Sequence, residues 1–183
     1  MADKRVDDCA AKADELFRKN RPEEAAKCMQ KLATQDPSNP EAQGALGRIL
    51  MRVGQREEAG AAFERAAQAA EAAPAAVKAV ALSNLASHEL LRGSASKALT
   101  HAEAAVKAES NATTLAILAE AQVRNGKATA GLATAEKALQ ANASSALASE
   151  AKGLALLALE RFDDAVAALK KATGACPFPC RPL

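Results

Sequence analysis

A column of turn-forming residues recurs along this 183-residue chain at nearly constant spacing. Its members are Asn20, Gly54, Gly93, Gly126 and Glu160. Successive members are 34, 39, 33 and 34 residues apart, and each closes a mostly apolar run. A period of this size indicates a stack of similar supersecondary units, none of which can bury its own apolar face alone. Because Asn and Gly adopt positive φ most cheaply, each turn is predicted to end a helix, whereas Glu160 predicts a strained or differently built last turn.

Three further columns keep the same register. A small residue stands five positions after each turn: Ala25, Ala59, Ala98, Gly131 and Ala165. A second small column, in the middle of each first helix, is expected to let the partner helix approach closely: Ala13, Gly47, Ala86, Ala119 and Gly153. A third column faces the next layer: Met29, Phe63, Ala102, Ala135 and Leu169. Its reduction to alanine in the third and fourth units predicts tighter packing or a thinner core there.

The composition favours helices. The chain is 49% hydrophobic but only 2% aromatic, with no tryptophan and no tyrosine. It is rich in alanine, the best helix former, and poor in β-branched residues. We therefore predict an all-α protein with closely packed helices and, because alanine buries little area, modest stability for its length.

The charge and the hydropathy exclude several classes of protein. With 24 basic and 22 acidic residues the formal net charge is +2, which gives no reason to expect nucleic-acid binding. No apolar run reaches the length of a membrane span without polar interruption. The first residues carry charges of both signs and no apolar segment, so we see no secretory signal and expect a cytoplasmic protein.

The four cysteines give no metal-binding or redox motif. We interpret Cys9 and Cys28 as small buried apolar residues on helices. Cys176 and Cys180 stand in a proline-rich tail, and their spacing differs from the two-residue gap of zinc or redox pairs. Two thiolates do not complete a zinc site, and a tail disulfide is the less favoured alternative in a reducing cytosol.

The columns divide the chain into five units of two helices each: 6–39, 40–73, 79–111, 112–145 and 146–179. The longer step between the second and third units predicts extended helices, from Glu57 to about Ala72 and from about Ala75 to Leu91. The outer side of the last helix is expected to be bare around Val166 and Leu169. Either the 176–183 tail folds back over it, or a partner or second copy covers it.

These residues resemble the tetratricopeptide repeat. Unit 40–73 matches best, with Leu46-Gly47, Gly54, Ala59 and Phe63 at the characteristic positions, although the usual Trp and Tyr are absent. The resemblance implies one domain over residues 1–179, built as a right-handed superhelical solenoid of antiparallel helix pairs, followed by the Pro/Cys tail 176–183.

The resemblance also implies that the first helices line a concave groove that binds a peptide or helix. The residues that we expect to contact it are Phe17, Arg18, Arg48, Met51, Arg52, Asn84, Ser87, Ile117, Glu120 and Arg124. Arg18, Arg48 and Arg52 favour an acidic partner segment, since guanidinium forks suit carboxylates. The alternative is that they pair with Asp14 and Glu41.

The last unit carries a second candidate feature of the groove. Its first helix places leucines and alanines at helical spacing: Leu147, Ala151, Leu154, Leu157 and Ala158. This stripe could hold an aliphatic segment of a partner, or it could be ordinary packing between repeats. The carboxylate clamp of chaperone-binding repeats is not expected, because Gly44 and Thr113 stand where that clamp needs lysine.

Nothing in the sequence predicts catalysis, a cofactor or a metal site. His88 and His101 are interpreted as solvated or capping residues, and helical hairpins rarely bring a nucleophile, a base and an acid together. We expect a protein-interaction adaptor or scaffold that captures a protein or peptide partner. The alternative is a structural subunit of a large assembly, such as a ciliary, trafficking or organelle complex, that binds through its ends and convex face and self-associates through its C-terminal helix.

Overall fold

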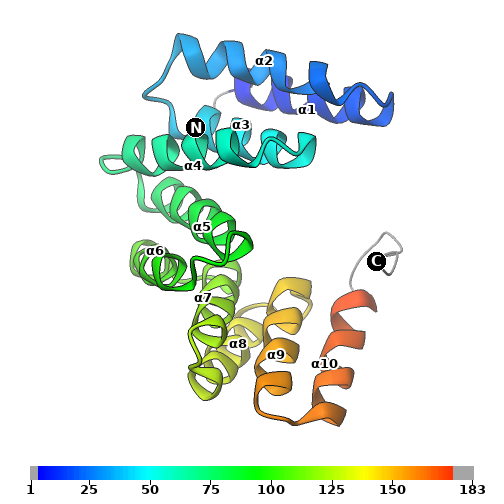
Figure 1. The fold of residues 1–183 in the computed structure, drawn as a ribbon. Coiled ribbons are helices and arrows are strands. Elements are labelled where there is room, and N and C mark those ends of the chain that lie inside the picture. The colour runs from blue at the N-terminus through cyan, green and yellow to red at the C-terminus, as the bar shows by residue number, and fades with distance from the viewer. Residues whose placement is uncertain (1–3, 175–183) are drawn as a thin grey trace. The chain divides into compact units, whose positions relative to one another are not determined.

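The computed structural model describes residues 4–174, and these residues form ten helices and no strand (Figure 1). The helices are α1 (Lys4–Arg18), α2 (Pro22–Gln35), α3 (Pro40–Val53), α4 (Arg56–Ala69), α5 (Ala75–Leu91), α6 (Ala95–Ala108), α7 (Ala112–Arg124), α8 (Ala128–Ala141), α9 (Ala146–Ala158) and α10 (Phe162–Gly174). They follow one another as helix pairs, two to each predicted repeat. The all-α prediction is therefore confirmed.

The helices belong to two compact units, Met1–His88 and Glu89–Leu183, which we call the N-terminal and the C-terminal unit. Their boundary falls near the end of α5. In the N-terminal unit α1 packs on α2 and α3, and α3 packs on α2 and α4. In the C-terminal unit α7 packs on α6, α8 and α9, and α9 packs on α8 and α10. Each unit thus buries its apolar faces between successive hairpins.

The turn column adopts the same backbone conformation at all five places. The φ angles are 56° at Asn20, 88° at Gly54, 76° at Gly93, 76° at Gly126 and 59° at Glu160. At each turn the following residue donates its N–H to the carbonyl five residues earlier, at 2.8–3.0 Å. This hydrogen bond is that of the Schellman motif, which satisfies carbonyl groups at a helix end. The turn at Glu160 is therefore built like the others, at the steric cost of a side chain in the left-handed region.

Several helices begin at residues that cap the free backbone N–H groups of the first turn. The Asn39 side chain accepts a hydrogen bond from Ala42 N–H at the start of α3, and Asn111 forms a capping box with Thr114 at the start of α7. The Ser145 hydroxyl accepts from Ala148 N–H at the start of α9. These helices supply the first half of their repeats, so the caps fix where α3, α7 and α9 start.

The small and the large columns compensate each other in volume. A Cβ on Gly47 would lie 2.5 Å from the Phe63 ring, and a Cβ on Gly153 would lie 2.6 Å from Leu169. Where the large column is reduced to Ala135, the small column has Ala119, and both pack in one buried cluster. The repeat therefore keeps its interhelical packing either with glycine against a large side chain or with alanine against alanine.

The extra residues between the second and third repeats lengthen only one helix. α5 spans Ala75–Leu91, as predicted, and has 17 residues. The predicted extension of the preceding helix to about Ala72 is wrong, because α4 ends at Ala69 and residues 70–73 form a turn before Pro74. Proline disfavours α geometry in the residue before it, which stops the helix short of the break.

The interpretation of Cys9 and Cys28 as merely small apolar residues is corrected by the structure. Cys9 is buried as expected, but its sulfur is bonded to that of Cys28, and the two Cα atoms are 5.6 Å apart. This separation is usual for disulfides. The bond joins α1 to α2 and closes the first repeat covalently.

His88 is also placed differently from the prediction of a solvated or capping residue. It is buried, and its ring centroid lies 5.7 Å from that of Phe63. Gly60 makes room for it, since a Cβ there would lie 2.7 Å from His88 Nε2. His101 is half-buried and shares a hydrogen bond of 2.8 Å between its Nδ1 and Glu89 Oε2.

The remaining predictions about the ends can be addressed only in part. Val166 of α10 is exposed as expected, whereas Leu169 is half-buried against Gly153. The predicted role of the 176–183 tail, including Cys176, Cys180 and a cover over α10, lies outside the described residues. None of the helices in residues 4–174 combines the length and the apolar character that crossing a membrane requires.

Candidate binding site

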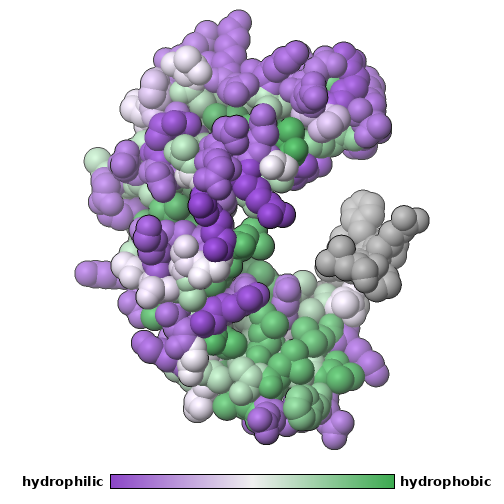
Figure 2. All heavy atoms as spheres, viewed as in Figure 1, coloured by the Kyte–Doolittle hydropathy of each residue, from purple (hydrophilic) through white to green (hydrophobic). Residues whose placement is uncertain are grey.

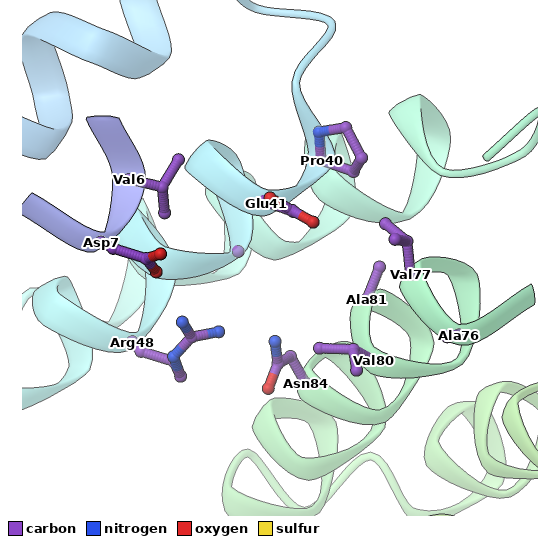
Figure 3. A pocket seen from close by; sticks show the side chains of 11 residues that line it. Val6, Asp7, Pro40, Glu41, Arg48, Ala76, Val77, Val80, Ala81 and Asn84 are labelled. Carbon is purple, nitrogen blue, oxygen red and sulfur yellow. The ribbon is translucent and has the colours of Figure 1, made fainter. Parts of the chain in front are cut away.

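A cavity of about 290 Å³ opens in the N-terminal unit between α1, α3 and α5 (Figure 3). Its lining residues are Val6, Asp7, Pro40, Glu41, Gly44, Arg48, Ala76, Val77, Val80, Ala81 and Asn84. All three helices are first helices of their repeats, the helices that the resemblance assigns to the groove. The structure thus brings together two of the predicted contact residues, Arg48 and Asn84.

Arg48 and Asn84 converge over a glycine. A Cβ on Gly44 would lie 3.5 Å from Asn84 Nδ2 and 3.8 Å from Arg48 Nη1, so two hydrogen-bond donors meet above the same point of α3. Figure 3 shows the two side chains reaching toward the cavity from α3 and α5. Because Gly44 has no side chain, nothing of its own fills the space between the donors.

Neither donor is satisfied by the described part of the chain. Arg48 is exposed and forms no hydrogen bond or ion pair with the other residues of 4–174, and partial burial of its guanidinium lowers its pKa. Asn84 Nδ2 is buried and has no acceptor among these residues. A buried donor without a partner costs about 1–3 kcal/mol, so the arrangement favours an acceptor supplied from outside.

The other walls of the cavity are apolar or acidic. Val77, Val80 and Ala81 of α5 form one side, and Val80 is exposed although it is apolar. Asp7 and Glu41 lie at the rim beyond Arg48 and Asn84, as Figure 3 shows. The cavity therefore offers two donors next to a small aliphatic surface, with carboxylates at one edge.

The other two arginines of the predicted cluster behave differently from Arg48. Arg52 forms an ion pair with Asp14, and its guanidinium lies 3.8 Å from the centroid of the Phe17 ring. The alternative of internal pairing thus holds for Arg52, and its guanidinium also covers one face of the Phe17 ring. Arg18 is exposed and does not line the cavity.

The remaining predicted contact residues are scattered. Met51 packs against the N-terminal core, and Ser87 is half-buried on α5. In the C-terminal unit Ile117 is only 6% exposed, which leaves little of it for a partner. Glu120 and Arg124 share a hydrogen bond of 3.3 Å along α7.

Sequence reasoning did not single out the wall of the cavity at the start of α5. Ala76 and Val77 lie before residue 79, where the third repeat was expected to begin. They reach the cavity because α5 starts at Ala75, four residues earlier. The longer step between the turns was the signal that could have indicated this wall, since extra helical residues must lie somewhere.

Two other cavities are properties of the repeat and not sites. One, of about 460 Å³, lies between α2, α3 and α4, and the other, of about 330 Å³, lies between α8, α9 and α10. They occupy equivalent seams between hairpins. Some of their polar side chains are bonded internally, as Gln43 is to Ala33 O and Lys152 to Glu136.

Solved structures share this fold. A fragment of MamA from Desulfovibrio magneticus RS-1 is 17% identical, with a TM-score of 0.67 over 96% of this chain and 97% of that one. TTC0263 from Thermus thermophilus is 19% identical, with a TM-score of 0.67 over 94% and 92%. YrrB, described as a repeat protein with an unusual peptide-binding site, is 19% identical, with a TM-score of 0.61 over 92% and 85%. No curated protein sequence matches the chain.

The sequence itself matches a family. The family model described as tetratricopeptide repeat matches residues 10–77 and 118–178, together more than half of the chain. The two matched regions include the turns at Asn20, Gly54, Gly126 and Glu160, and the ten helices fit about five repeats. The chain therefore belongs to the tetratricopeptide-repeat family.

Proposed function

We propose that the protein is an interaction scaffold whose N-terminal groove captures an acidic segment of a partner protein. The observation that carries this proposal is the convergence of the buried, unpaired Asn84 amide with the exposed Arg48 guanidinium in the cavity over Gly44. The family supports it, because tetratricopeptide-repeat proteins bind protein or peptide partners, and YrrB is described as having a peptide-binding site.

The chemistry of the cavity defines the segment. A carboxylate accepts two parallel hydrogen bonds from a guanidinium, and this charge-assisted pair gains strength where the guanidinium is already partly desolvated. The amide of Asn84 can bond a backbone carbonyl beside it. Val77, Val80 and Ala81 suit a neighbouring aliphatic residue. Because Asp7 lies at the rim, a second acidic residue there would be repelled, and we expect a single carboxylate next to an aliphatic side chain.

Selection from a displayed peptide library tests the proposal. The wild-type protein is expected to enrich peptides in which Asp or Glu adjoins an aliphatic residue. Arg48→Glu should abolish this enrichment, and Asn84→Ala should weaken binding of the selected peptides about tenfold. Arg18→Glu is the matched control, because it reverses an exposed charge outside the cavity. Equal selection by wild type and Arg48→Glu would contradict the proposal.

A second function, a structural subunit of an assembly, is favoured by a different observation. Phe162 and Val166 of α10 are large apolar residues with exposed fractions of 61% and 48%. An exposed apolar helix face suits contact with another chain or another copy. Light scattering of the purified protein tests this function: self-association that Val166→Asp removes supports it, and a monomer at high concentration contradicts self-association through α10.

A further inference from the structure

One face of α9, which packs on α7 in the C-terminal unit, carries large apolar side chains that residues 4–174 leave exposed or half-buried. Leu147 and Leu157 of α9 are exposed, the latter by 41%, and Leu154 is half-buried. Figure 2 shows that apolar surface gathers on the C-terminal unit, whereas the visible face of the N-terminal unit is mostly hydrophilic. Leu147 and Leu154 are seven residues apart, two helical turns, so they share one face of α9.

An acidic pair interrupts this apolar stripe. Glu150 lies three residues after Leu147 and four before Leu154, which places it on the same helix face. It is exposed and forms no hydrogen bond or ion pair with residues 4–174. Across the packed α7–α9 pair stands Glu120, whose side chain is 23% exposed and bonded only to Arg124.

The two carboxylates stand on neighbouring helices, since α7 packs on α9. Burial is the main cause that raises the pKa of Glu120; Arg124 opposes the rise, and repulsion from Glu150 adds to it. A cation placed between Glu120 and Glu150 would relieve the repulsion and would replace part of the lost hydration. Arg124 does not provide this positive charge to both carboxylates, since its hydrogen bond goes to Glu120.

We propose that the α7–α9 surface is a docking site for an amphipathic helix that carries a basic residue between two aliphatic residues. The aliphatic residues would cover Leu147 and Leu154, and the lysine or arginine would lie between Glu120 and Glu150. The site belongs to the C-terminal unit and uses none of the residues of the N-terminal cavity, so it extends the proposed function without depending on it.

A helix fits this surface better than an extended peptide. An extended backbone must find hydrogen-bond partners for its own N–H and C=O groups, whereas a helix satisfies them internally. The polar groups on this surface are the carboxylates of Glu120 and Glu150 and the guanidinium of Arg124, which is already bonded to Glu120. In the N-terminal cavity, by contrast, Asn84 offers an amide to a peptide backbone.

A designed peptide tests the site. The probe is an alanine-rich helical peptide with two leucines seven residues apart and a lysine between them, and the control peptide has glutamate in place of that lysine. Fluorescence anisotropy of the labelled peptides gives the affinity, and ¹⁵N chemical-shift changes of the protein show where the probe binds. We expect the lysine peptide to bind at least about tenfold more tightly than the glutamate peptide and to shift α7 and α9 resonances.

Variants of the protein sharpen the test. Glu150→Lys should reverse the preference, so that the glutamate peptide binds better than the lysine peptide. Leu147→Asn, at an exposed position, should weaken both peptides without affecting the fold. Arg48→Glu should leave the binding of the lysine peptide unchanged, which separates this site from the N-terminal cavity. No binding of the lysine peptide, shifts confined to other helices, or an unaltered preference in Glu150→Lys would each overturn the proposal.

Discussion

The two units use the same repeat but place their large apolar side chains differently. The N-terminal core contains Met29, Leu46, Ile49, Leu50 and Phe63, all buried. Two buried clusters of the C-terminal unit consist of alanines, with Ala116, Ala138 and Ala148 in one and Ala119, Ala135 and Ala151 in another. Fewer large apolar residues are buried there, among them Ile117 and Leu156. Apart from the buried Leu156, the larger apolar residues of α9 and α10 are partly or largely exposed.

This difference shows that the spacing of the repeat does not determine the size of the side chains that pack in its core. Glycine against phenylalanine and alanine against alanine both satisfy the packing at the same register. The consequences for stability are unequal, because buried area stabilises by about 25 cal/mol per Å² and alanine buries little of it. We therefore expect the stability of the N-terminal unit to depend more strongly on large buried residues than that of the C-terminal unit does.

Truncation of the large column is expected to have the largest effect. Phe63→Ala should destabilise the protein by about 3–5 kcal/mol, since it leaves a cavity in the N-terminal core. The corresponding change in the C-terminal unit, Ala135→Gly, should cost only about 1–2 kcal/mol, from helix propensity and the loss of one buried methyl group. Because the chain lacks tryptophan and tyrosine, unfolding by urea is best followed by circular dichroism. Equal losses in the free energy of unfolding for the two variants would contradict this difference between the units.

Reduction of the disulfide should have the next largest effect, and only on the N-terminal unit. Cys9 and Cys28 are 19 residues apart, and a loop of that size predicts a loss of about 2–4 kcal/mol when the bond is opened. Denaturant unfolding with and without dithiothreitol measures it. The Cys9→Ser/Cys28→Ser variant, as control, should not respond to the reductant. An identical unfolding midpoint of the wild type in both conditions would argue against the bond in solution.

A methyl group added to the small column should cost less. Gly47→Ala brings a Cβ to within 2.5 Å of the Phe63 ring, and overpacking of this kind costs about 1–3 kcal/mol. Gly44→Ala, one helical turn earlier, meets nothing closer than 3.5 Å and should be neutral or stabilising, because alanine favours the helix. Gly47→Ala combined with Phe63→Leu should recover part of the loss. If Gly47→Ala and Gly44→Ala unfold at the same urea concentration, close packing against Phe63 does not explain why residue 47 is glycine.

The smallest predicted effect is a pH dependence of opposite sign in the two units. The pKa of Glu120 is raised, chiefly by burial, so protonated Glu120 stabilises the native state below pH 4.5 and this contribution is lost as the pH rises through its folded value. The pKa of Glu15 is lowered, chiefly by a hydrogen bond from Lys19, so its contribution is present above pH 4.5 and is lost as the pH falls.

Glutamine variants separate these two contributions. Glu120→Gln should flatten the decline in stability above pH 4.5, and Glu15→Gln should flatten the decline below it. Urea unfolding across this range measures both, and we expect small changes because Glu15 is exposed. A change of the same sign in both variants would show that the local environments do not control these carboxyl groups.

The sequence predicted the architecture because the decisive signals are local. A glycine or asparagine after an apolar run specifies a left-handed helix end without reference to the rest of the fold, and Gly54, Gly93, Gly126 and Asn20 all adopt it. Even Glu160 does so, since its position in the repeat outweighs its own preference. The extension of α5 was likewise predictable from the longer step between turns.

The site was predictable only in part because it depends on how side chains meet. The sequence places Arg18, Arg48 and Arg52 in the same register, but only the structure shows that Arg52 pairs with Asp14 while Arg48 meets Asn84 over Gly44. The disulfide between Cys9 and Cys28 requires a particular crossing of α1 on α2, which spacing alone does not specify. The burial of His88 similarly follows from the room left at Gly60.

The most direct test of the account follows the Asn84 side-chain amide by NMR while an acidic–aliphatic peptide is titrated into the wild-type protein and into Arg48→Glu. The account predicts that the amide resonance shifts with the same affinity as the backbone resonances of α3 and α5, and that Arg48→Glu weakens this affinity at least about tenfold. An Asn84 resonance that does not move, or an affinity that Arg48→Glu does not change, would contradict the claim that this cavity captures the partner.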